Sequence, residues 1–164
     1  MNRLRRSNGQ SLLELSVGLT VAVPIMLLLI DCAMIALGAG TNDAVCRDAA
    51  RAAASGPPGQ LIASANRTVP GAEPPNQRAV AVIKRVYQSN LPMKLRETVN
   101  VVESVNGPVP AAPLGGPVSG KVAVQTTVDI YPPFLVGAYL GAGGLEFKSR
   151  HSYPYTYVVP NTTP

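Results

Sequence analysis

One apolar run, Leu12–Ile30, constrains this chain more than any other part of its sequence. As an α-helix the run is about 28 Å long, which matches the hydrocarbon thickness of a bilayer, so we predict a transmembrane span over residues 12–30. Apolar residues resume from Cys32 to Leu37, and a span that extends to residue 37 is the alternative. Pro24 removes one helical hydrogen bond inside the span and predicts a kink there.

The residues before the run are basic and polar. Residues 1–9 contain Arg3, Arg5 and Arg6, and the positive-inside rule therefore predicts a cytoplasmic N-terminus. The formal net charge of the chain is +5, and three of these charges belong to this leader, which leaves +2 for the remainder. The other basic residues are scattered and form no clustered face, so nucleic acid is not an expected partner.

Two familiar kinds of N-terminal processing fit the sequence poorly. A signal peptidase would cut near Ala36–Gly38, but the apolar run is longer than a signal-peptide core and contains Glu14. Lipidation at Cys32 requires small residues just before the cysteine, and this chain has Leu29–Asp31 there. A third site therefore has to be considered, at the start of the apolar run.

Gly9, Gln10 and Glu14 lie where the basic leader of residues 1–9 meets the apolar run. This pattern resembles the prepilin processing site of type IV pilins and their relatives. The resemblance implies that a prepilin-type peptidase cuts after Gly9, so that Gln10 becomes the first mature residue and Glu14 the fifth. It also implies that Glu14 pairs with the N-terminal amine of a neighbouring subunit during assembly.

Physical chemistry independently makes Glu14 a candidate functional residue. A charged side chain in an apolar membrane helix costs roughly 2.5 kcal/mol or more unless a partner neutralises it. The new α-amino group at Gln10 would be such a partner. The alternative is that the Glu14 side chain only reaches the membrane surface.

An alanine-rich stretch, Asn42–Ala54, extends the helix beyond the membrane. We predict one helix from Gln10 to Ala54, within an N-terminal unit of residues 10–55 that ends at a Gly-Pro-Pro sequence. The stretch resembles the segment after the span in TadE-like proteins, the pseudopilins of the tight-adherence (type IVc) pilus system. In them an Ala-rich helix carries an Ala-Arg pair, as Ala50-Arg51 does here. Asp31 is a secondary assembly candidate, because it either pairs with a neighbouring subunit or stays hydrated at the outer membrane face.

Cys32 and Cys46 cannot bridge each other within one straight helix, because about 21 Å of helix axis separates them. Either both are small buried or lipid-facing side chains, or Cys46 links two subunits. Neither lies at metal-ligand spacing, and His151, the only histidine, lies in a predicted strand. We found no convincing catalytic set, so we expect no enzyme, no cofactor and no metal site.

Beyond the helix, residues 56–75 form a predicted connector and residues 76–160 a predicted extracytoplasmic domain. Asn76 is expected to cap an amphipathic helix that ends before Pro92. Strict alternation over residues 120–131 predicts a strand.

Two further segments, 97–105 and 145–158, are predicted to pair with that strand. The expected fold is α+β: a long transmembrane helix, then a small domain with one amphipathic helix on an antiparallel sheet of about three strands.

Residues 132–144 form an unusually apolar connection that precedes the last predicted strand. They form a loop that covers the core, a short helix, or a patch that touches the membrane or another subunit. The order of a Val-rich strand, Tyr-Pro-Pro, a Gly-rich connection and a last strand is similar to the C-terminal part of TadE-like proteins.

The resemblance implies a minor pilin or pseudopilin that acts in assembly of a tight-adherence pilus or a related secretion or adhesion machine. It implies a single-pass protein of the bacterial inner membrane, with its C-terminal domain in the periplasm or outside the cell. The expected partners are a prepilin-type peptidase, other pilin or pseudopilin subunits, inner-membrane assembly proteins and the lipid bilayer. The alternative is a signal-anchored extracytoplasmic binding domain that enters no pilus.

Overall fold

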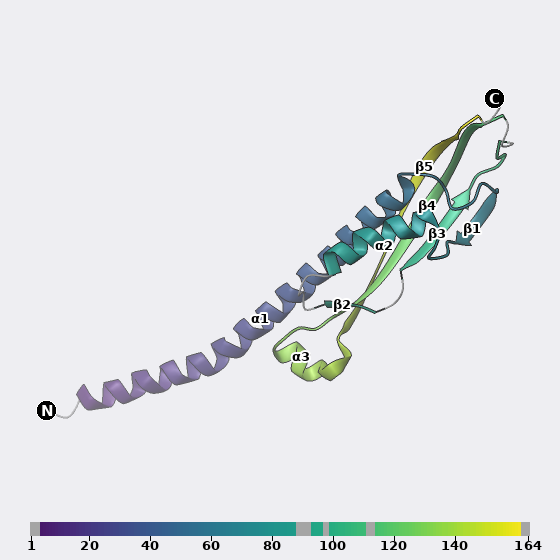
Figure 1. The fold of residues 1–164 in the computed structure, drawn as a ribbon. Helices are drawn as coiled ribbons and strands as arrows, with labels where there is room; N and C mark the ends of the chain where they lie inside the picture. The colour runs from purple at the N-terminus through teal and green to yellow at the C-terminus, as the bar shows by residue number, and fades with distance from the viewer. Residues whose placement is uncertain (1–3, 88–92, 97–98, 111–113, 162–164) are drawn as a thin grey trace.

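A computed structural model of the chain contains one long helix with an α+β domain around its C-terminal half (Figure 1). The structure describes residues 4–87, 93–96, 99–110 and 114–161. Helix α1 (Leu4–Ala54) continues without interruption through Pro24 and ends where it was predicted to end. It begins at Leu4 rather than at Gln10, because leucine and arginine favour helix and no proline breaks the chain before Gln10.

The domain contains a five-stranded antiparallel sheet. Its strands are β1 (Ser64–Thr68), β2 (Met93–Leu95), β3 (Asn100–Val105), β4 (Gly116–Ile130) and β5 (Leu145–Val159). β5 pairs with β4 along its whole length, from Gly116 opposite Val159 to Ile130 opposite Leu145. β3 and β2 pair with successive parts of the other edge of β4, and β1 pairs with the outer edge of β3.

The α+β fold and the three predicted strands are confirmed, but the predicted number of strands was wrong. The missed strand β1 lies inside the predicted connector of residues 56–75 and has no apolar alternation. Its pairing with β3 is irregular, and Asn66 has a φ angle of 53°, which asparagine tolerates better than most residues. The missed strand β2 has three residues, too few for a periodic pattern to be recognised.

Helix α2 (Pro74–Tyr87) and the C-terminal half of α1 pack side by side on one face of the sheet (Figure 1). The helix starts at Pro74, a favoured residue at a first helical position, and Asn76 lies inside the first turn instead of capping it. The buried Asn76 amide donates a hydrogen bond to the Val69 carbonyl at 3.0 Å. Asn76 therefore fastens α2 to the chain segment that precedes it.

Small side chains let α1 approach the sheet closely. The buried apolar residues of the main core are Val45, Cys46, Ala49, Ala50, Ala53, Val69, Ala79, Ile83, Val101, Val122, Val124 and Tyr155. The sulfur of Cys46 lies 3.2 Å from the Val124 carbonyl and 3.3 Å from the Ser149 carbonyl. This position favours the buried-side-chain interpretation of Cys46, whereas Cys32 is exposed.

Helix α3 (Leu135–Leu140) and the short 3-10 helix η1 (Gly141–Gly143) connect β4 to β5. Of the local structures expected for residues 132–144, the chain therefore adopts a short helix rather than a loop that covers the core. Figure 1 shows α3 at the end of the sheet that faces the projecting half of α1.

Candidate membrane anchor and its junction with the domain

The N-terminal half of α1 projects from the domain as a bare apolar helix (Figure 1). Its exposed large apolar residues are Leu12, Leu13, Leu15, Val17, Leu19, Val21, Val23, Ile25, Met26, Leu28, Leu29 and Ile30. Within the described residues, this is one helix long and apolar enough to cross a membrane. Such a helix is stable only where lipid or other apolar helices cover it, because water solvates this much hydrocarbon poorly.

The candidate processing and assembly residues lie at the start of this bare segment. Gly9 and Gln10 belong to the regular helix, one turn before Glu14. The Gln10 side-chain amide donates a long hydrogen bond of 3.4 Å to the exposed Glu14 carboxylate. An uncharged amide does not neutralise a carboxylate, so Glu14 still requires a cation if it enters the membrane.

Asp31 lies about 26 Å further along the helix axis than Glu14, so the two predicted assembly residues are not brought together. Its carboxylate is fully buried and accepts hydrogen bonds from the backbone N–H groups of Phe134 and Val136, at 3.0 and 2.8 Å. The first turn of α3 has no side-chain cap of its own. Asp31 supplies this cap from α1, because amides at a helix start need acceptors and favour negative charge.

Gly38 permits α1 to pass close to the end of β4. A Cβ atom at this glycine would lie 2.6 Å from the Cδ1 atom of Ile130, a fully buried side chain. Any larger residue at position 38 would force Ile130 to move.

Asn42 is a buried polar residue at the contact between α1 and the sheet, and the sequence did not predict its role. Its side-chain carbonyl accepts hydrogen bonds from the hydroxyls of Tyr87 at 3.0 Å and Thr126 at 2.8 Å. Its amide donates to the Phe147 carbonyl at 3.4 Å. Burial raises the pKa of the Tyr87 hydroxyl to about 12, so it remains a donor. No local sequence signal marks Asn42, because the two hydroxyls that it binds lie 45 and 84 residues away in the chain.

Asp43 joins α1 to β5 at the neighbouring position. Its carboxylate lies 2.7 Å from Nε2 of His151 and accepts hydrogen bonds from Ser149 at 2.9 Å and Arg47 at 3.0 Å. The hydrogen bond from His151 is the largest cause that lowers the pKa of Asp43, from 3.8 to about 2, followed by Ser149 and Arg47.

The lowered pKa of Asp43 predicts a pH dependence of stability. A carboxyl whose pKa is lower in the folded state stabilises the fold above its unfolded pKa, and this contribution is lost as the pH falls through the folded pKa. We therefore expect the stability difference between the wild type and Asp43→Asn to shrink between about pH 4 and pH 2. Denaturant unfolding of the full chain in detergent across this range measures the difference. A difference that stays constant from pH 5 to pH 2 would contradict the prediction.

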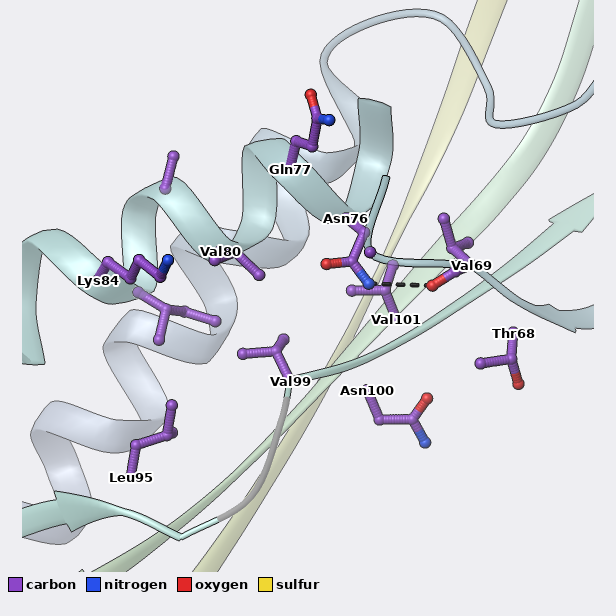
Figure 2. Close-up of a pocket in the computed structure, with 13 residues that line it drawn as sticks. Thr68, Val69, Asn76, Gln77, Val80, Lys84, Leu95, Val99, Asn100 and Val101 are labelled. Atoms are coloured by element: carbon purple, nitrogen blue, oxygen red, sulfur yellow. Dashed lines mark hydrogen bonds between the residues drawn. The ribbon is translucent and has the colours of Figure 1, made fainter. Parts of the chain in front are cut away.

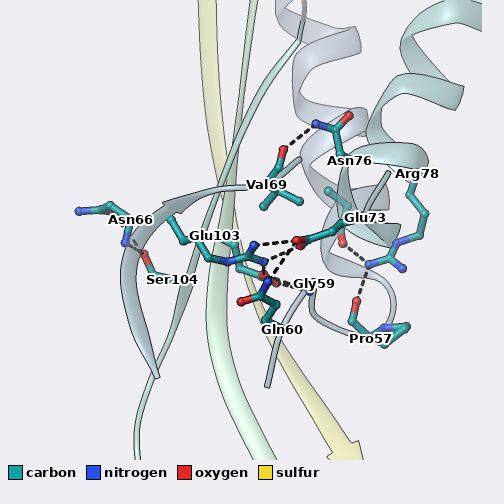
Figure 3. A network of polar contacts seen from close by, with 12 residues as sticks. Pro57, Gly59, Gln60, Asn66, Val69, Glu73, Asn76, Arg78, Glu103 and Ser104 are labelled. Atoms are coloured by element: carbon teal, nitrogen blue, oxygen red, sulfur yellow. Dashed lines mark hydrogen bonds and ion pairs between the residues drawn. The ribbon is translucent and has the colours of Figure 1, made fainter. Parts of the chain in front are cut away.

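A buried ionic network fastens β1 to β3 and to the start of α2 (Figure 3). The Arg67 guanidinium donates to both Glu73 oxygens, at 2.8 and 2.6 Å, and to Glu103 at 3.0 Å. Glu103 is fully buried and also accepts the Gly59 N–H, at 3.2 and 3.0 Å from its two oxygens. The hydrogen bond from Arg67 lowers the pKa of Glu73, and the two carboxylates raise the pKa of Arg67.

Arg78, on α2, caps the C-terminal end of α1. Its guanidinium donates to the carbonyls of Ala52 at 3.1 Å, Ala53 at 2.7 Å and Pro57 at 3.0 Å, the last of which is labelled in Figure 3. These carbonyls lie at or just beyond the helix end, where intrahelical donors are missing. The second helix thereby holds the end of the first.

A groove of about 1020 Å³ lies between α2, β2 and β3 (Figure 2). Its lining is mainly apolar and includes Val80, Ile83, Leu95, Val99 and Val101. Figure 2 also shows the Asn76–Val69 hydrogen bond at one end of the groove.

Helix α1 thus has an apolar surface long enough to cross a membrane, and a polar junction with the domain. In the described part of the chain, no group of three or more His, Cys, Asp or Glu side chains is placed to hold a metal ion. Protein-family models, curated proteins and solved structures yield no match to this chain.

Proposed function

We propose that this chain is a membrane-anchored minor pilin or pseudopilin that acts in assembly of a tight-adherence type pilus or a related machine. The observation that carries the proposal is the bare apolar half of α1, in which Glu14 is the only charge between residues 10 and 30. A helix of this kind suits storage in a bilayer and later packing against equivalent helices of other subunits.

In the proposed assembly, the cut after Gly9 removes the basic leader and creates a positive α-amino group on Gln10. That amine is one helical turn from Glu14 of its own chain, and in a packed bundle it can reach Glu14 of a neighbour instead. Pairing with a neighbour neutralises a carboxylate that is costly in an apolar surrounding. The pairing would therefore fix the axial register of adjacent subunits.

Processing is the first prediction of this proposal. In cells that contain a prepilin peptidase, we expect the membrane-extracted protein to have lost residues 1–9 and to begin at Gln10. The cut is expected after Gly9 because the basic leader stays in the cytoplasm, which places the Gly9–Gln10 bond at the membrane surface within reach of the peptidase. Intact mass and N-terminal sequencing measure the cut. The Gly9→Ala variant and a peptidase-deficient strain should both retain the leader.

An uncut leader in every sample would contradict the pilin proposal and favour the signal-anchored binding domain. The apolar groove between α2 and β3 is the observation that supports this second candidate, because ligand sites are commonly concave and apolar. A cut that also occurs in Gly9→Ala and in the peptidase-deficient strain would likewise exclude a prepilin-type substrate.

A further inference from the structure

Helix α3 is apolar but contributes no buried residue to the domain. Phe134 is 40% exposed, Leu135 is 42% exposed and Tyr139 is 92% exposed. The chain carries no charged residue between Asp129 and Glu146. Exposed apolar residues that cluster in one segment indicate contact with an apolar partner.

The hydrogen bonds of Asp31 fix the level of α3 along the membrane helix. Because Asp31 holds the backbone amides of Phe134 and Val136, the first turn of α3 lies beside residue 31 of α1. The apolar run ends at Ile30, one residue earlier. With Leu12–Ile30 across the hydrocarbon core, α3 lies at the outer membrane–water interface.

The charged residues on the domain side of α3 agree with its placement at the outer membrane–water interface. Arg96 forms ion pairs with Glu146 and, at 3.6 Å, with Asp129, and Lys148 pairs with Glu146 at 2.8 Å. Asp129 and Glu146 are register partners one position from the end of the β4–β5 pairing. Charged side chains thus begin one position into the β4–β5 pairing, on the domain side of the uncharged α3 connection. This is the expected position of charges where lipid headgroups give way to water.

We propose that α3 and Phe134, here called the foot, lie on the outer surface of the same bilayer that α1 crosses. The foot places Tyr139 among the lipid headgroups, where tyrosine is enriched in membrane proteins, and its apolar residues contact the upper acyl chains. Asp31 is the positioning residue, since it fastens the foot to the end of the span. This inference rests on the membrane anchoring in the proposed function, but not on processing or assembly.

The chain contains no tryptophan, so single tryptophans can report the depth of chosen positions. The full-length protein is reconstituted in phosphatidylethanolamine/phosphatidylglycerol vesicles with bromines near the headgroup or deep in the acyl chains. We expect shallow bromines to quench Tyr139→Trp more strongly than deep ones do. Leu19→Trp, in the middle of the span, should show the opposite order. Val158→Trp, also exposed but at the far end of β5, should be quenched by neither.

The variants distinguish failure of the foot from failure of the anchor. If Leu19→Trp is quenched by deep bromines but Tyr139→Trp by neither kind, the foot is wrong and the anchor stands, with another subunit as the remaining partner for α3. If neither variant is quenched, both the anchoring and the foot are wrong.

Asp31→Ala in the Tyr139→Trp background tests the positioning role. We expect Asp31→Ala to abolish the shallow quenching of Tyr139→Trp. In the Leu19→Trp background, Asp31→Ala should leave the deep quenching unchanged, because the span remains inserted while the foot is released. Far-UV circular dichroism checks that the fold is retained. Shallow quenching that persists in Asp31→Ala would overturn the role of Asp31.

Discussion

Replacing Arg67 by methionine is expected to lower the free energy of unfolding by about 3–5 kcal/mol, the usual cost of removing one partner of a buried ion pair. Methionine keeps much of the apolar stem but leaves the fully buried Glu103 without its cation. Glu73 loses the same partner but is partly exposed, so water can solvate it at lower cost. The expected loss is a large fraction of the stability of a small domain.

The loss of unfolding free energy is measured by denaturant unfolding of the full chain in detergent, monitored by the near-UV circular dichroism of the tyrosines. Arg47→Met is the matched control, because Arg47 forms an exposed ion pair within α1 that should be worth about 0.5 kcal/mol or less. Adding Glu103→Gln to Arg67→Met should recover part of the loss, since no buried charge is then left unpaired. Equal losses in the two arginine variants would refute the special role of the network.

Substitution of Glu14 by alanine is expected to abolish most incorporation into an assembled filament while leaving processing and membrane insertion intact. In the proposed assembly, the carboxylate is costly in an apolar helix until the amine of a neighbour pairs with it, so the favourable pairing would set the register. Loss of a charge-assisted hydrogen bond worth about 1.5–3 kcal/mol corresponds to roughly one to two orders of magnitude in incorporation. Removal of the charge makes bilayer insertion easier, so the subunit should accumulate in the membrane.

Immunoblots of sheared filaments and of the membrane fraction measure how much of each variant enters filaments and how much stays in the membrane. Glu14→Gln should behave like Glu14→Ala, because it keeps the shape and loses the charge. Ser16→Ala is the control, because Ser16 is another exposed polar residue of the same helix, and this variant should assemble like the wild type. If Glu14→Gln subunits enter filaments as efficiently as the wild type, charge pairing at this position is not the assembly device.

Elements with a long, regular pattern could be predicted from the sequence. The apolar run Leu12–Ile30 needs only hydropathy and length, and the alternation over residues 120–131 reports a strand with one face on the core. The amphipathic helix α2 was visible for the same reason, although its start at Pro74 was not. β1 and β2 are short, and they form because neighbouring strands offer them partners, which local sequence does not reveal.

Candidate site residues could be recognised in the sequence only where one segment contains the whole pattern. Gly9, Gln10 and Glu14 lie within a short stretch, so their pattern can be recognised without a structure. Asp31 could be identified as an unusual charge, but its partners lie 103 and 105 residues away in an apolar connection. Asn42 similarly depends on Tyr87 and Thr126, which only the packing of α1 on the sheet brings together.

The continuity of α1 has a mechanical consequence. The same helix is the bare apolar rod at one end and the central element of the core at the other, and the structure shows no loop between them. A pull along the rod therefore reaches the sheet as shear spread over the contacts of Asn42, Asp43 and Cys46 at once, with no hinge to absorb it. Shear across many parallel contacts resists rupture better than peeling one contact at a time. In the proposed function, this continuity would let the subunit be drawn out of a bilayer by its helix without unfolding its domain.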